Sequence, residues 1–187
     1  MSLTYVIPDI HGRFDLMSEA WHRVHAYAAG NGGTLIMIGD YVDKGPDSNK
    51  VIARLRRGMP DGWTFIALKG NHDAMMAAGL RDPARMAHWL ERGGDTVIRS
   101  YGGDPRAIPE DDIAWLEALP LTYADAHRVY VHAGLDPGLA LDAQNVTTLL
   151  WKRYPKGDAA GFDGRHIVHG HDSVARGPEL YDGRTNL

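Results

Sequence analysis

The chain contains no cysteine in its 187 residues. Disulfide bonds, thiolate-bound metals and cysteine nucleophiles are therefore excluded as sources of its stability or chemistry. The absence of cysteine is compatible with the reducing interior of a cell, and we expect a cytoplasmic protein.

Long apolar segments and an excess of positive charge are missing as well. No apolar run approaches the roughly 20 residues that cross a bilayer, and the first residues lack the basic segment and apolar core of a signal peptide. Lys and Arg number 20 against 24 Asp and Glu, for a formal net charge of −4. We therefore expect neither a nucleic acid nor a membrane as partner, while the oligomeric state stays open.

Short apolar runs alternate with stretches of helical spacing, and an apolar share of 44% suffices for a hydrophobic core. We expect one domain over residues 1–187 with an α/β (α+β layered) fold. The predicted strands are Leu3–Ile7, Leu35–Ile38, Thr64–Leu68, Val129–Val131 and Ile167–Val168. The predicted helices are Phe14–Ala29, Ser48–Arg57, Ala84–Arg92 and Asp111–Leu119.

Each predicted strand is followed by polar residues and glycine. The five runs lead into PDIHG (8–12), GDYVDKG (39–45), KGNHD (69–73), HAG (132–134) and HGH (169–171). Loops at the carboxyl ends of neighbouring strands converge, so we expect these segments to form one site. A single Asp-x-His or Gly-Asn-His is most often only a turn, but five such segments in one chain point to a shared function.

The side chains in these segments suit a pair of divalent cations. Asp9 and His11 can project to the same side of one strand exit and hold the first ion. Asp40 can bridge both ions through its two carboxylate oxygens. We expect Mn²⁺, with Fe or Zn²⁺ as alternatives, because the donors are hard to borderline. The candidate ligands that complete the second ion's site are Asn71, His132 and His171.

The same segments resemble the signatures of the phosphoprotein phosphatase branch of the calcineurin-like metallophosphoesterases. That family reads GDxHG, GDxxDRG, GNHE/D, VHAG and a late glycine-histidine; this chain has PDIHG, GDYVDKG, GNHD, VHAG and HGH in the same order. Segments 89–102 (WLERGGDTVIRSYG) and 149–153 (LLWKR) resemble its bacterial members. The resemblance covers nearly the whole chain and implies a β-sandwich of two mixed sheets flanked by helices.

The resemblance also implies a mechanism. His72 would protonate the leaving oxygen, and Asp43 would orient its imidazole. Arg153 and Lys44 would hold the phosphate. The implied reaction is hydrolysis of a phosphate monoester by direct attack of a hydroxide that bridges the two metals, without a covalent enzyme intermediate. His171 is preferred over His169 as ligand, because the family's ligand follows the glycine.

Three departures from the family pattern stand out. Pro8 replaces the usual glycine, and Lys44 replaces the usual arginine, which exchanges a bidentate fork for a point charge. Lys44 followed by Gly45 and Pro46 is similar to relatives of diadenosine tetraphosphatase. Family members commonly continue beyond residues 184–187, so we expect the chain to lack part of a sheet.

Two classes of function remain alongside the main one. We expect a serine/threonine phosphatase-like enzyme that acts on a phosphorylated protein or a small phosphorylated substrate. The alternatives are a dinucleoside polyphosphate hydrolase and, more remotely, a metal-binding scaffold without catalysis. The intact motifs argue against the scaffold. The tryptophans Trp21, Trp63, Trp89 and Trp115 are expected to be packing residues only.

Overall fold

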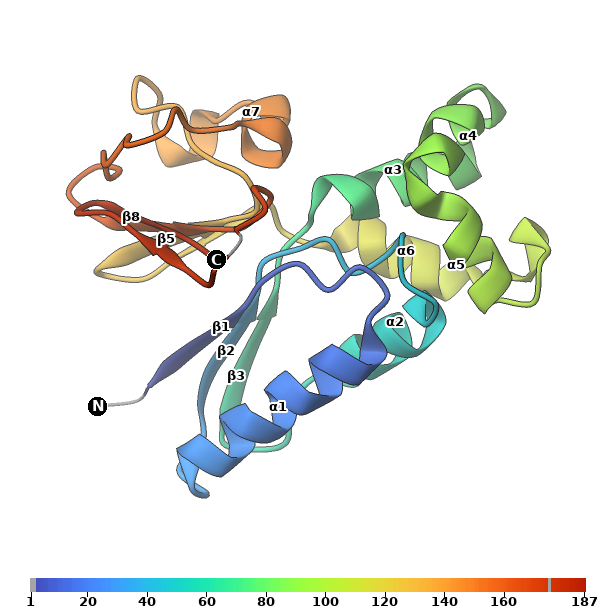
Figure 1. The fold of residues 1–187 in the computed structure, drawn as a ribbon, viewed down its shortest axis with the longest axis horizontal. Coiled ribbons are helices and arrows are strands. Elements are labelled where there is room, and N and C mark those ends of the chain that lie inside the picture. Colours follow the sequence, from blue (N-terminus) through green and yellow to red (C-terminus); the bar gives the residue numbers. More distant parts are fainter. Residues whose placement is uncertain (1–2, 175) are drawn as a thin grey trace.

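The computed structural model describes residues 3–174 and 176–187. The strands β1 (Thr4–Ile7), β2 (Gly33–Met37) and β3 (Trp63–Ala67) form a parallel sheet in that order (Figure 1). The helix α1 (Phe14–Ala28) joins β1 to β2, and α2 (Ser48–Arg56) joins β2 to β3. Parallel neighbours need such crossovers, because the chain must return to the same end of the sheet before the next strand begins.

The second sheet has five strands in the order β4-β5-β6-β8-β7. The strands β5, β6 and β8 are parallel, whereas β4 and β7 run antiparallel at the two edges. The predicted pair of sheets is confirmed; the larger sheet is mixed, while the smaller one is wholly parallel. The bounds are β4 (Thr122–Ala124), β5 (Arg128–Val131), β6 (His166–His169), β7 (Glu179–Leu180) and β8 (Arg184–Asn186).

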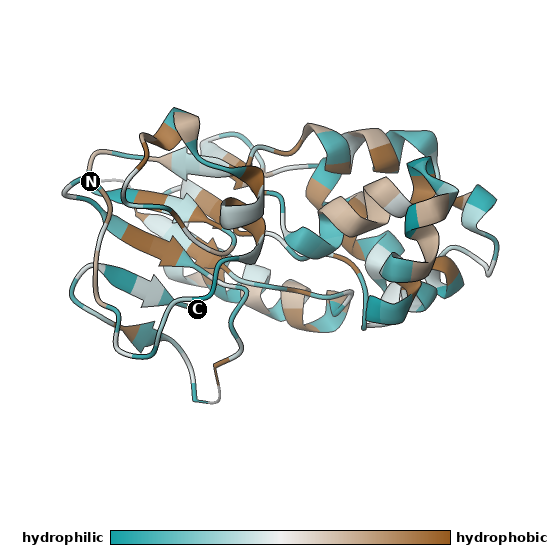
Figure 2. Ribbon diagram, turned by 90° about the horizontal axis from the view of Figure 1, so that it is seen from above, coloured by the Kyte–Doolittle hydropathy of each residue, from teal (hydrophilic) through white to brown (hydrophobic). Residues whose placement is uncertain are grey.

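Side chains of the parallel sheet alternate between two cores, as the period of two in a strand requires. In β2, Leu35 and Met37 belong to the core shared with the helices, while Ile36 belongs to the core shared with the second sheet. There Ile36 is clustered with Tyr130 of β5 and Val168 of β6. Figure 2 shows apolar residues along some of the strands, whereas other strands are white to teal, in keeping with the polar sequence of β8. The two apolar layers hold the strand ends, and the loops that follow them, in fixed register.

A group of helices extends from one end of the sandwich (Figure 1). It comprises α3 (Asn71–Arg81), α4 (Pro83–Trp89), the π-helical turn η1 (Leu90–Gly94), α5 (Asp95–Ser100) and α6 (Glu110–Ala118). Short 3-10 turns lie at Pro105–Ala107 and Leu141–Ala143, and α7 (Val146–Trp151) packs on the second sheet. In the part of the chain that the structure describes, no helix is long and apolar enough to span a bilayer.

The predicted helices compare closely with the observed ones in three cases, with bounds that agree within one residue. The helix predicted at 84–92 is different: its regular part ends at Trp89, and a π-helical turn follows. Gly93 in that turn has a φ of 104°, which no α-helix accommodates. No bounds were predicted for strands β4, β7 and β8 or for helices α3, α5 and α7.

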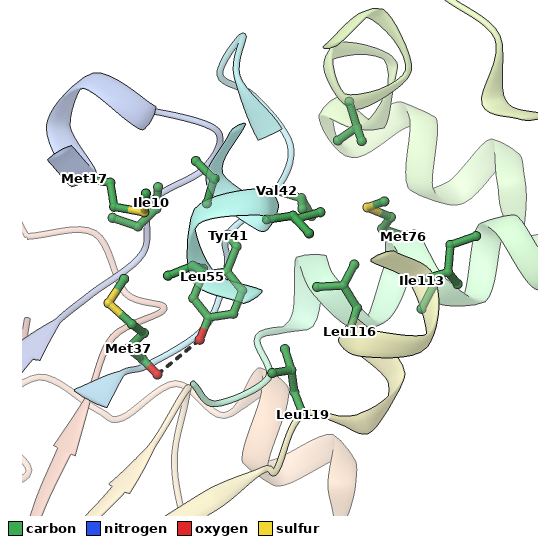
Figure 3. Close-up of a cluster of buried hydrophobic side chains, with 14 of the residues drawn as sticks. Ile10, Met17, Met37, Tyr41, Val42, Leu55, Met76, Ile113, Leu116 and Leu119 are labelled. Carbon is green, nitrogen blue, oxygen red and sulfur yellow. Dashed lines mark hydrogen bonds between the residues drawn. The ribbon is translucent and has the colours of Figure 1, made fainter. Parts of the chain in front are cut away.

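The loop after β2 is anchored in the larger core. Tyr41 and Val42, inside the second motif, are fully buried in the same cluster as Met76 (Figure 3). The Tyr41 hydroxyl donates to the backbone carbonyls of Leu68 at 2.6 Å and Met37 at 3.2 Å. Since these contacts fix the middle of the loop, they also fix the polar side chains on either side of it.

Candidate active site

The loops after β1 and β2 are joined by backbone hydrogen bonds. The N–H groups of Ile10 and His11 donate to the carbonyl of Asp40 at 3.0 and 2.8 Å, and the N–H of Gly45 donates to the carbonyl of His11 at 2.9 Å. A Cβ on Gly12 would lie 2.8 Å from the carbonyl oxygen of Gly45, so only glycine permits this approach. The two loops therefore act as one rigid platform.

Asp40 lies at the centre of the site and is almost fully buried. Its Oδ1 accepts the backbone N–H of His72 at 2.9 Å and lies 3.5 Å from Nε2 of His132. Its Oδ2 lies 3.5 Å from Nε2 of His11. One carboxylate thus faces histidines that come from two different sheets.

Hydrogen bonds from Nδ1, the ring nitrogen that faces away from Asp40, orient both His132 and His11. His132 Nδ1 donates to the carbonyl of Ile38 at 2.9 Å, and His11 Nδ1 donates to the carbonyl of Val42 at 2.9 Å. The Nε2 atom of each ring then carries the lone pair. The Nε2 of His132 lies 2.8 Å from Oδ1 of Asn71, so two acceptor atoms face each other. A cation between them is the simplest partner for both.

The remaining predicted ligands lie at the same place. Nδ1 of His171 is 3.1 Å from Oδ1 of Asn71, and its buried Nε2 has no hydrogen-bond partner among the described residues. Oδ1 of Asp9 accepts the N–H of His171 at 3.4 Å and lies 4.0 Å from Nδ1 of His132. The six residues predicted as ligands are therefore brought together around one point.

Two groups of side chains in this cluster have metal-ligand geometry. One consists of His11, Asp40 and His72, and the other of Asp40, His132 and His171; within each group the donor atoms lie within 4.8 Å of one another. Asp40 belongs to both, as a bridging carboxylate would. The first group contains His72 where we had expected Asp9, whose carboxylate lies beside the two groups.

Burial sets the charge state of the cluster. It raises the pKa of Asp40 well above its usual range, and the nearby charge of Asp9 adds to the effect. Burial also lowers the pKa of His11 and of His171 to about 4. At neutral pH the imidazoles are thus lone-pair donors, and paired buried carboxylates favour a bound cation. The donors present fit a site for two divalent metal ions.

His72 and Asp43 form a second feature of the site. Nδ1 of His72 lies 2.6 Å from Oδ2 of the fully buried Asp43. Burial lowers the pKa of His72 and raises that of Asp43, so the pair favours a state without net charge. In that state Nε2 of His72 carries a proton, and the His72 ring lines the open pocket. This arrangement can deliver a proton to a departing oxygen.

An open pocket of about 610 Å³ lies over the cluster, and three cationic side chains line it. Lys44 places Nζ 2.8 Å from Nε2 of His11, and Arg153 is paired with Asp172. The third cation, Arg92, was missed by the sequence analysis. It bonds only to the ring and the carbonyl of His88, at 3.0 and 3.1 Å, and has no carboxylate partner among the described residues. The sequence feature that could have marked Arg92 as a site residue is the pair of glycines, Gly93 and Gly94, that follows it directly.

His169 lies apart from the ligand cluster. Its Nε2 accepts from Arg184 at 2.8 Å and its Nδ1 lies 3.0 Å from the carbonyl of Gly170. Both ring nitrogens are therefore occupied by the protein. Of the two histidines in HGH, it is His171 that borders the pocket, in keeping with the preference made from the resemblance.

Comparison with known proteins decides the family. Residues 3–187 match the calcineurin-like phosphoesterase family. The chain belongs to the calcineurin-like phosphoesterases. This membership confirms the resemblance seen in the motifs, and the family as a whole depends on two metal ions.

Relatives of this calcineurin-like phosphoesterase carry two kinds of name. It is 34% identical over 140 residues to a symmetrical bis(5'-nucleosyl)-tetraphosphatase of Delftia acidovorans, a match that covers 71% of this chain and 44% of that protein. It is 33% identical over 182 residues to serine/threonine-protein phosphatase 1 of Salmonella typhimurium, covering 92% of this chain and 79% of the phosphatase. The chain thus spans less than half the length of the tetraphosphatase that it matches.

Among solved structures, the fold is similar to a protein provisionally described as a diadenosine tetraphosphatase. The TM-score is 0.69 at 23% identity, and the match covers 100% of this chain and 87% of the other. This similarity shows that the two proteins share a fold. It leaves the substrate of this phosphoesterase open, as do the two names among the sequence relatives.

Proposed function

We propose that the protein hydrolyses phosphate monoesters at a two-metal centre, with phosphorylated serine and threonine side chains as its first substrate class. The observation that carries the proposal is Asp40, whose carboxylate is shared by two groups of metal-ligand geometry beside the His72–Asp43 pair. Two divalent cations, when bound, supply an activated water and offset the charge of the phosphate. A cytoplasmic location and Mn²⁺ as the metal stay predictions.

The proposed roles follow from position. His11 would hold the first ion together with Asp9, whose carboxylate lies beside the two ligand groups, and Asp40 would bridge. The side chains of the second ion would be Asn71, His132 and His171. Lys44 and Arg153 border the pocket and would hold the phosphoryl oxygens as charge develops on them. His72 would protonate the leaving oxygen, oriented by Asp43.

The share of this chain that each match covers supports a protein phosphatase as the first candidate. The match to the Salmonella phosphatase covers 92% of this chain, whereas the match to the Delftia tetraphosphatase covers 71% of it. The pocket opens to solvent, and exposed side chains such as Trp151 lie on its lining. This leaves space for a peptide segment around a phosphorylated residue.

Dinucleoside polyphosphate hydrolysis is the second candidate, and Arg92 favours it. A phosphate monoester carries one phosphoryl group, but the pocket is lined by three cations. Arg92 is unpaired among the described residues, and its charge acts on His72, which faces the leaving group in the proposed reaction. An anionic leaving group, such as the second half of a polyphosphate chain, would use this cation.

The experiment compares kcat/KM for phosphoserine and phosphothreonine peptides, diadenosine tetraphosphate and p-nitrophenyl phosphate, after reconstitution of the metal-free protein with Mn²⁺, Fe²⁺ or Zn²⁺. We expect hydrolysis only with metal, and the highest kcat/KM for a phosphopeptide. A higher value for diadenosine tetraphosphate would select the second candidate. Stoichiometric metal binding without hydrolysis of any of the substrates would refute both and identify a scaffold.

A further inference from the structure

We propose that Trp89 is a positioning residue for the His72–Asp43 pair, because its indole N–H fixes the carboxylate that orients the imidazole. The inference rests on the proposed function, since it assumes that His72 protonates a leaving oxygen. It replaces the expectation that Trp89 is a packing residue only.

The two oxygens of Asp43 have separate partners. Oδ2 contacts Nδ1 of His72 at 2.6 Å, and Oδ1 accepts from Nε1 of Trp89 at 2.8 Å. Asp43 and Trp89 are both 0% exposed, so water does not compete for either hydrogen bond. With both oxygens engaged, the carboxylate plane is fixed and presents Oδ2 to the imidazole in one orientation. Three side chains thus form a line from the core to the pocket.

The surrounding backbone leaves a slot that matches the indole. A Cβ on Gly94 would lie 2.5 Å from Cε2 and 2.7 Å from Nε1 of Trp89, and a Cβ on Gly79 would lie 3.1 Å from its Cε3. Gly94 has a φ of −63°, which any residue adopts, so its backbone conformation does not require glycine. Glycine is required there because the indole occupies the space that a Cβ would need.

The slot also connects Trp89 to the site through the chain. Gly79 belongs to α3, the helix whose first two residues are Asn71 and His72. The N–H of Lys44 meets the carbonyl of Gly93 at 3.4 Å, which brings the turn after Trp89 against the loop that carries Asp43. The indole therefore lies between α3, which carries His72, and the turn that is hydrogen-bonded to the loop of Asp43.

Loss of the indole N–H would leave Oδ1 of Asp43 buried without a donor, and the carboxylate would turn toward any other donor within reach. The imidazole would then spend less time in its productive orientation. Substrates with a poor leaving group depend most on protonation, so they would lose the most rate. Substrate binding, which uses other side chains, would change little.

The test replaces Trp89 with benzothienylalanine, which keeps the indole shape but has sulfur in place of N–H, and with phenylalanine. Trp21→Phe is the matched control, because Trp21 is also buried but its Nε1 has no hydrogen-bond partner in the described structure. With an alkyl phosphate we expect kcat to fall about tenfold or more, the range for loss of an outer hydrogen-bond partner. With p-nitrophenyl phosphate the fall should be smaller, and KM should stay similar for both substrates.

A second measurement needs no catalysis. In the metal-free protein, the ¹⁵N signal of His72 Nδ1 reports its hydrogen bond to Asp43. We expect it to shift toward the value of a free imidazole in both Trp89 variants and in Gly94→Ala, and to stay in place in Trp21→Phe. An unchanged His72 signal, or equal loss of kcat for the two leaving groups, would overturn the role of Trp89. If the wild-type protein hydrolyses none of the substrates while the His72 signal still shifts in the Trp89 variants, the proposed function is refuted and the positioning contact is not.

Discussion

The carboxylate of Asp73 accepts the backbone N–H of Asp40 at 2.9 Å through Oδ2. The same oxygen accepts the N–H of Gly70 at 2.9 Å, and Oδ1 accepts the N–H of Tyr41 at 2.9 Å. Asp73 is fully buried and therefore ties the loop after β2 to the first turn of α3. Both segments carry proposed metal ligands, so the geometry of the site depends on a residue that touches no metal.

Replacement of Asp73 by asparagine removes one acceptor and points an amide nitrogen at backbone N–H groups. We expect the affinity for Mn²⁺ to fall about 10–100-fold, the usual effect of losing an outer partner of a metal ligand. Isothermal titration calorimetry on the metal-free protein measures it. Asp82→Asn is the control, because Asp82 caps α4 at an exposed position through the N–H of Ala84. An unchanged Mn²⁺ affinity in Asp73→Asn would contradict the prediction.

His72→Asn separates proton transfer from metal binding. We expect kcat for an alkyl phosphate to fall by about 10²–10⁴, the range for loss of a general acid. The metal content should stay near that of the wild type, as measured by elemental analysis after dialysis. Asparagine keeps the backbone N–H that Oδ1 of Asp40 accepts. A near-native rate on the alkyl phosphate would show that another group protonates the leaving oxygen.

Metal stoichiometry distinguishes a bridging ligand from a terminal one. We expect His171→Ala to weaken one of two Mn²⁺ sites, because His171 belongs to only one of the two ligand groups. Asp40→Asn should weaken both, because Asp40 belongs to both. Isothermal titration calorimetry of the metal-free variants with Mn²⁺ gives the number of sites and their affinities. Equal effects of the two substitutions on both sites would contradict the assignment of Asp40 as the bridge.

Arg92→Gln tests the anionic leaving group. A charge-assisted hydrogen bond contributes about 1.5–3 kcal/mol, so the ratio of kcat/KM for diadenosine tetraphosphate to that for p-nitrophenyl phosphate should fall roughly 10–100-fold. The control is Arg99→Gln, an exposed arginine paired with Asp95, which should leave the ratio unchanged. A constant ratio in Arg92→Gln would remove the observation that favours the second candidate function.

His169 gives the metal-free protein a specific pH dependence. Burial lowers its pKa to about 4 from 6.5, so below 6.5 the unfolded chain binds the proton and the folded chain does not. Its contribution to stability is present above pH 6.5 and is lost as the pH falls toward 4. Relative to His169→Gln, the wild type should lose on the order of 3 kcal/mol of unfolding free energy between pH 7 and 4. Urea denaturation at both values measures this, and a pH-independent difference would contradict it.

Much of the fold was accessible from local patterns. The three strands of the parallel sheet, and helices such as α1 and α6, were predicted within one or two residues, because their apolar periodicity is strong over a sufficient length. The bounds of helix α3 were not predicted, because its first residues, Asn71, His72 and Asp73, are polar and yet buried. Strands β7 and β8, of two and three residues, are too short to show a period.

The candidate site divides in the same way. The residue types and the glycines beside them predicted which loops meet. Five of the six predicted ligands line one pocket, and the sixth, His132, is fully buried and contacts Asn71 and Asp40. Arg92, Asp73 and Trp89 were not assigned a role in the site; for Asp73 and Trp89 the reason is that each bonds to a partner far along the chain. The indole of Trp89, for example, bonds to Asp43 across a separation of 46 residues. A pattern read over neighbouring residues cannot reveal a contact between residues so far apart in the sequence.

The sequence by itself determined the donor types, their order and their place after apolar runs, and these are the basis for proposing two metals and a phosphate ester. Only the tertiary structure decided how these groups are held. Whether a buried carboxylate bridges two ligand groups, and whether a tryptophan packs or donates, depends on distances of 2.8 to 3.5 Å between segments from different elements. Such distances are set by the packing of two sheets and a helical group, because hydrogen bonds and metal coordination fall off within fractions of an ångström.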